Sequence, residues 1–95
     1  MADGATHYIV TYDICDPKRL HHVFNAMRKY GEHLQLSVFE CTLDDQQEVL
    51  LRTALRRIIH SSDDQVLFIR VGNAATTITA IGRPYAHKGH DVTVL

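Results

Sequence analysis

Residues 8–20, Tyr-Ile-Val-Thr-Tyr-Asp-Ile-Cys-Asp-Pro-Lys-Arg-Leu, place a strand, a carboxylate and a helix start in one short stretch. The apolar and β-branched run from Tyr8 to Tyr12 favours a buried strand. Asp16 followed by Pro17 predicts a helix start, because proline keeps the preceding residue in the extended geometry of an N-cap and lacks an N–H that the first turn would leave unsatisfied. Asp13 is therefore expected at the carboxyl end of a strand. Ligands of α/β layers tend to bind near such ends, so Asp13 is either a functional carboxylate or a solvated strand-end residue.

Two amphipathic helices follow from the spacing of apolar residues. Residues 17–30 carry one apolar stripe at helical spacing, made by Leu20, Val23, Phe24 and Met27. Gly31 is the expected C-cap of this helix. A second helix is expected to start at Asp44, which forms a capping-box pattern with Gln47. Its buried stripe is formed by Leu51, Ala54, Leu55 and Ile58, widened by Leu50 and Ile59, whereas a solvated face is expected for Arg52, Arg56 and Arg57.

The remaining segments predict strands. Residues 33–43 alternate in polarity, which fits either a tight hairpin near Ser37–Val38 or one bent strand. Residues 65–71 form a further strand, residues 78–84 are ambiguous, and residues 91–95 close the chain as a short strand. The order is β-α-β-β-α-β with an additional C-terminal strand. It predicts a single α+β domain over residues 1–95, ferredoxin-like, with its core in residues 7–82.

Composition limits the function classes. The chain has 95 residues and a net charge of −1, so no global basic field attracts nucleic acid and any such contact needs a local patch or a metal ion. No apolar run is long enough to cross a membrane and no signal peptide is present, which predicts a cytoplasmic protein. Strands 8–14 and 66–71 are apolar on both faces, yet right-handed crossovers place both helices on one face of the sheet. A second copy of the chain is the expected cover of the other face.

Four motifs, in this order and spacing, carry a resemblance to a known family. They are Tyr12-Asp13-Ile14, Asp16-Pro17-Lys18-Arg19-Leu20, Gln35-x-Ser37-Val38-Phe39-Glu40 and Ile81-Gly82-Arg83-Pro84. Over essentially its whole length, the chain resembles the small CRISPR-associated endoribonuclease family, the second of the two universal CRISPR adaptation proteins.

The resemblance implies a homodimer in which strand 91–95 extends the sheet of the partner subunit. It also implies a role in spacer acquisition, in which the dimer bridges subunits of the CRISPR integrase and binds DNA. Some members of the family cut single-stranded RNA or double-stranded DNA with Mg²⁺. By position, Asp13 matches the catalytic metal ligand and Tyr12 a second catalytic residue, while positions matching nucleic-acid contacts are held by Lys18, Arg19, His33 and Phe39. Many relatives carry arginine where His33 stands.

The chemistry of these residues is compatible with that role and leaves alternatives open. Mg²⁺ or Mn²⁺ is commonly bound by one or two carboxylates, so one Asp13 is a poor site and two copies across a dimer axis are an adequate one. Tyr12 and Phe39 either stack on bases or pack in the core. The functional alternatives are a structural adaptor, a metal-dependent nuclease, and a stand-alone metal-dependent ribonuclease related to toxin nucleases of the same fold. Ferredoxin-like regulators that bind small effectors fit the order of elements but not the motifs.

Overall fold

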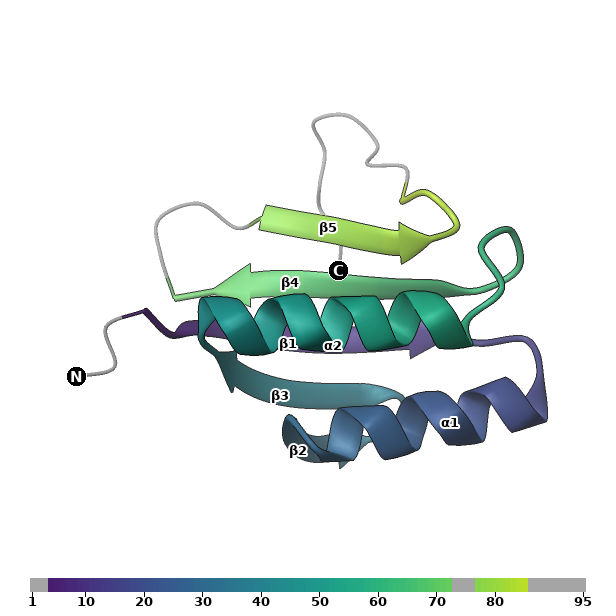
Figure 1. The fold of residues 1–95 in the computed structure, drawn as a ribbon, viewed down its shortest axis with the longest axis horizontal. Coiled ribbons are helices and arrows are strands. Elements are labelled where there is room, and N and C mark those ends of the chain that lie inside the picture. The colour runs from purple at the N-terminus through teal and green to yellow at the C-terminus, as the bar shows by residue number, and fades with distance from the viewer. Residues whose placement is uncertain (1–3, 73–76, 86–95) are drawn as a thin grey trace.

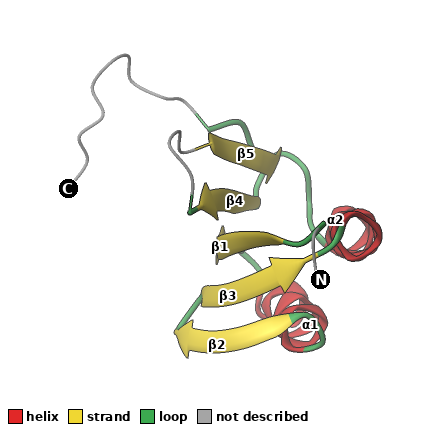
Figure 2. Ribbon diagram, turned by 90° about the vertical axis from the view of Figure 1, so that its left-hand side faces the viewer, coloured by secondary structure: helices red, strands yellow, loops and turns green. Residues whose placement is uncertain are grey.

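The computed structural model describes residues 4–72 and 77–85. The described elements are β1 (Thr6–Asp13), α1 (Pro17–Arg28), β2 (Gly31–Gln35), β3 (Val38–Leu43), α2 (Asp45–Ile58), β4 (Gln65–Val71) and β5 (Thr77–Gly82). They form one antiparallel sheet in the order β2-β3-β1-β4-β5 (Figure 1). Both helices lie on one face of this sheet (Figure 2). The predicted ferredoxin-like α+β fold is confirmed, whereas the predicted strand 91–95 lies outside the described residues.

Both helices begin where the sequence predicts. Asp16 has extended geometry (φ −120°, ψ 133°), and its side chain accepts a hydrogen bond of 2.9 Å from the backbone N–H of Arg19. At α2, Asp44 Oδ1 accepts from the Gln47 N–H at 2.8 Å, and Gln47 Oε1 accepts from the Asp44 N–H at 3.0 Å. This reciprocal capping box satisfies two backbone donors that the first turn would otherwise leave free.

Gly31 has a different role from the predicted C-cap. Helix α1 ends at Arg28, Lys29 is its C-cap residue, and Gly31 opens β2. A Cβ at Gly31 would collide with the carbonyl oxygen of Glu40 and with Cys41 Sγ. Glycine is therefore required here because strands β2 and β3 approach closely. Of the two interpretations of residues 33–43, the structure has the hairpin, with Gln35 opposite Val38, and the ambiguous segment near residue 78 forms β5.

The core lies between the sheet and the two helices. Buried side chains of β1, β3 and β4 meet buried positions of both helices, namely Val23, Met27, Leu51 and Leu55. Leu20 and Leu50, which were expected to be buried, are 41% and 52% exposed. Arg52 also departs from the prediction, because its guanidinium packs over the Phe68 ring at 4.0 Å and pairs with Glu48 at 3.0 Å instead of forming a solvated face.

The opposite face of the sheet is apolar and is not covered by either helix (Figure 2). Ile9, Ile69 and Ile78 stand directly across from one another on β1, β4 and β5, and each is half-buried. Ile9, Thr11 and Asp13 alternate with the buried positions of β1, so all three project onto this face. We call it the open sheet face. Neither α1 nor α2 is long and apolar enough to cross a membrane.

Candidate functional site

Asp13 is the last residue of β1, and its side chain is 70% exposed. Its Oδ2 accepts a hydrogen bond of 3.1 Å from Nη2 of Arg83, which makes an ion pair between residues 70 positions apart in the sequence. The sequence gave no indication of a salt-bridge partner for Asp13, because a pair separated this far depends on the sheet topology. Asp13 is therefore exposed, as expected for a strand end, but it is not an isolated carboxylate.

Arg83 is fixed by contacts of both its backbone and its side chain. Its N–H donates to the carbonyl oxygen of Asp64 at 2.7 Å, and its own carbonyl accepts from Gln65 Nε2 at 3.0 Å. Its guanidinium Nη1 donates to the Asp63 carbonyl at 2.6 Å. The preceding Gly82 has φ +91°, a conformation that suits glycine. This local structure aims the guanidinium at Asp13.

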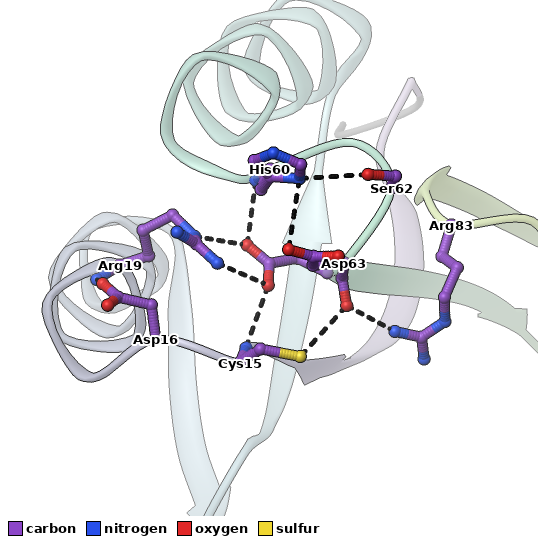
Figure 3. A network of polar contacts seen from close by, with 8 residues as sticks. Cys15, Asp16, Arg19, His60, Ser62, Asp63 and Arg83 are labelled. Carbon is purple, nitrogen blue, oxygen red and sulfur yellow. Dashed lines mark hydrogen bonds and ion pairs between the residues drawn. The ribbon is translucent and has the colours of Figure 1, made fainter.

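A buried carboxylate, Asp64, organises this edge of the fold. Its side chain is completely buried. Oδ1 accepts from the Cys15 N–H at 2.9 Å and Oδ2 from the His60 N–H at 2.8 Å. Arg19 donates to both oxygens, from Nε at 2.7 Å and from Nη2 at 3.2 Å. These contacts connect the loop after β1, the first turns of α1 and the segment after α2 (Figure 3).

The hydrogen bonds from Arg19, together with those from the two backbone N–H groups, hold the pKa of Asp64 far below its usual range, although burial alone would raise it. The sequence analysis treated residues 61–64 as a turn and did not identify Asp64 as important. The only sequence signal is an aspartate placed directly before a buried strand.

The two basic residues at the start of α1 have different environments. Lys18 is exposed, whereas the Arg19 guanidinium is engaged by Asp64 and its side chain is only 28% exposed. The unfavourable position of Arg19 at the positive end of the helix is thus compensated by a buried internal anion. A nucleic-acid contact through Lys18 remains a prediction, while Arg19 has a structural partner within the chain.

Tyr12 and Phe39 pack against each other in the core. Phe39 is completely buried and Tyr12 is 5% exposed, with ring centroids 6.3 Å apart and planes inclined by 28°. This confirms the packing alternative for both and corrects the expectation that Phe39 presents a ring to nucleic acid. Burial also raises the pKa of the Tyr12 hydroxyl. Because side chains alternate along a strand, Tyr12 and Asp13 project to opposite faces of the sheet.

His33 is exposed on β2, where its ring packs edge-to-face against Phe24 at 5.0 Å. Its Nε2 lies 2.8 Å from the carbonyl oxygen of Leu36, within the hairpin. His33 and Lys18 thus both lie at the surface, on the strand β2 and the helix α1 that contact each other. They are the two proposed nucleic-acid residues that the structure leaves accessible.

A metal does not fit the residues of one chain alone. Within residues 4–72 and 77–85, no three His, Cys, Asp or Glu side chains gather closely enough to hold a metal ion. Asp13 supplies one carboxylate, and one of its oxygens already faces Arg83. Divalent ions with oxygen ligands usually need more anionic groups than this or a phosphate. A Mg²⁺ or Mn²⁺ site at Asp13 therefore requires a second copy of the chain.

The sheet order, the two helices on one face and the acidic end of β1 define a small ferredoxin-like protein. The chain belongs to the CRISPR associated protein Cas2 family, whose model matches residues 6–77. It is 40% identical over 74 residues to the CRISPR-associated endoribonuclease Cas2 1 of Rhodospirillum rubrum, covering 78% of this chain and 72% of that one. It is 35% identical to the CRISPR-associated endoribonuclease Cas2 of Geobacter sulfurreducens, covering 82% and 85%.

Solved structures give the same assignment. The fold is similar to a crystal structure of a hypothetical protein from Thermus thermophilus, with a TM-score of 0.71 and 34% identity over 86% of this chain and 100% of that one. It is also similar to Streptococcus pyogenes Cas2 at pH 6.5, with a TM-score of 0.66 and 35% identity over 70% and 86%. The family resemblance predicted from the four sequence motifs is confirmed.

Proposed function

We propose that this protein acts in CRISPR spacer acquisition as a homodimeric adaptor that bridges integrase subunits and binds DNA. The observation that carries the proposal is the open sheet face. Ile9, Ile69 and Ile78 form an apolar row across three strands, and neither helix covers it. Burying such a row against an equivalent face stabilises a dimer through the hydrophobic effect.

The dimer also bears on Asp13. This side chain projects onto the open sheet face together with Ile9 and Thr11. A second copy that covers the face therefore brings its own Asp13 to the same side of the sheet. Two carboxylates then form the acidic pair that one chain lacks, and a divalent ion bound there would supply an activated water and a contact to a phosphodiester oxygen. We propose Mg²⁺-dependent cleavage of RNA or DNA as a secondary activity, supported by the names of the relatives.

The dimer is tested by Ile69→Lys, which places a charge in the centre of the open sheet face. We expect this variant to sediment as a monomer at micromolar concentration, because the charge would be buried without a partner in the interface. Val49→Lys is the matched control, since Val49 is 62% exposed on α2 and lies on the other side of the molecule. A wild-type protein that is monomeric at this concentration would remove the basis of the proposal.

Asp13→Asn separates the adaptor from the nuclease. The variant keeps the shape of the side chain but removes two negative charges per dimer. We expect Mg²⁺-dependent cleavage to be lost, and dimerisation and spacer integration with the cognate integrase to stay close to wild type. Asp63→Asn is the matched control, because Asp63 lies near the same edge and its side chain is 57% exposed. Collapse of integration in Asp13→Asn, with the dimer intact, would show that Asp13 chemistry is needed and refute the adaptor.

A further inference from the structure

We propose that Arg83 is a built-in counter-cation of Asp13 and competes with a divalent ion for this carboxylate. The inference rests on the part of the proposed function that gives Asp13 a metal. In the folded chain Asp13 Oδ2 already faces Arg83 Nη2 at 3.1 Å. The acidic end of β1 is thus neutralised before any ion arrives. Arg83 belongs to the Ile81-Gly82-Arg83-Pro84 motif, to which the sequence analysis assigned no separate role.

Arg83 differs from an ordinary surface arginine because the chain holds it in place. Its backbone N–H is bonded to Asp64, its carbonyl to Gln65, and its Nη1 to the Asp63 carbonyl. Asp64 is itself fixed by backbone N–H groups of two segments and by Arg19. A side chain with this much support loses little conformational freedom when its remaining arm, Nη2, reaches Asp13.

Arg83 and a metal ion cannot share Asp13 without cost. A divalent ion on the carboxylate would lie within a few ångströms of the guanidinium, and two cations at that separation repel each other. The ion must therefore displace Nη2 from Asp13 or bind more weakly beside it. Because Nη1 is anchored to the Asp63 carbonyl, the displaced guanidinium would remain near the site. Removing the charge at position 83 should then strengthen metal binding.

The test measures Mn²⁺ binding to full-length wild-type protein, Arg83→Gln, Arg57→Gln and the double variant Arg83→Gln/Asp13→Asn by calorimetry. Glutamine keeps a hydrogen-bond donor but no charge. Arg57 is an exposed cation in the last turn of α2, so its variant controls for the change in net charge. We expect Arg83→Gln to bind Mn²⁺ roughly 3- to 10-fold more tightly than wild type, as follows from losing a partly exposed ion pair and a nearby like charge. Arg57→Gln should change affinity less than 2-fold, and the double variant should lose the gain.

Several outcomes overturn the inference. Arg83→Gln with the affinity of Arg57→Gln would show that Arg83 does not compete, and weaker binding would show that it assists the ion. Absence of Mn²⁺ binding in wild type and Arg83→Gln alike would also refute it. None of these results alters the expected integration by Asp13→Asn, so the adaptor proposal is judged separately. If Arg83→Gln fails to fold, Mg²⁺ titration of ¹⁵N-labelled wild type decides, because the Arg83 Nε resonance must shift with the midpoint found by calorimetry.

Discussion

Replacing Asp64 by asparagine tests whether the buried carboxylate holds this edge of the fold together. Asparagine has nearly the same shape, but it carries no charge, and its amide group faces donors where a carboxylate oxygen accepts. The side chain is completely buried and accepts four hydrogen bonds, two from backbone N–H groups and two from Arg19. The substitution therefore leaves at least one buried donor without an acceptor and removes the counter-charge of Arg19.

The magnitude follows from these contacts. Removing one partner of a buried ion pair costs about 3–5 kcal/mol, and the lower end applies here because Arg19 is 28% exposed and can regain water. We expect the free energy of unfolding to fall by about 3 kcal/mol. For a domain of this size, that corresponds to a fall in melting temperature of roughly 12–24 °C. The proteins must be compared at one concentration, since a dimer's melting temperature depends on it.

The pH dependence gives a second measurement with a defined sign. The pKa of Asp64 is lowered in the folded state, so its contribution to stability is present above the unfolded pKa and is lost as pH falls. The difference in stability between wild type and Asp64→Asn should be constant between about pH 5 and 8 and should shrink below about pH 4. Chemical denaturation across this range, with Asp63→Asn as the exposed control, measures it. A cost below about 1 kcal/mol at pH 7, or a difference that grows at acid pH, would refute the reasoning.

Three further predictions follow from packing. Gly82→Ala should destabilise the protein by about 2 kcal/mol or more in thermal unfolding, because φ is +91° and a Cβ would collide with the Asp64 carbonyl, whereas Gly72→Ala, with φ +102° and open space around it, should cost only about 1 kcal/mol; equal costs would contradict this. Phe39→Ala should lower the free energy of unfolding by about 3–5 kcal/mol while the DNA affinity of the folded fraction stays unchanged, and a selective loss of DNA binding would restore a base-stacking role. Burial raises the pKa of the Cys41 thiol to about 11, so iodoacetamide at pH 8 should modify the exposed Cys15 and spare Cys41 until the protein unfolds.

Much of the fold follows from local sequence patterns. Asp16 before Pro17 and Asp44 before Gln47 predict helix starts because capping depends on residues a few positions apart. The alternation of apolar residues predicts the strands for the same reason. Leu20 shows where this reasoning fails, because its spacing matches the buried stripe of α1 but the end of the helix extends beyond the neighbouring core and leaves the side chain 41% exposed.

The candidate site was predicted only in part. The position of Asp13 at a strand end follows from residues 8–17 and is confirmed by the structure. Phe39 was placed among nucleic-acid residues by resemblance, and only its burial shows that it belongs to the core. Arg52 appeared to belong to a solvated face until its packing over Phe68 was visible. In each case the deciding contact is made with a residue from another element.

The sequence by itself determined the order of helices and strands, the helix caps, the family and the strand-end position of Asp13, because these depend on neighbouring residues and on short motifs. Only the tertiary structure decided the partners of the charged groups. The Asp13–Arg83 pair joins residues 70 positions apart, and the Arg19–Asp64 pair joins residues 45 apart. Charge attraction in a chain has no characteristic sequence spacing, so such pairs become defined only when the sheet order brings the ends of β1, α1, α2 and β5 to one edge.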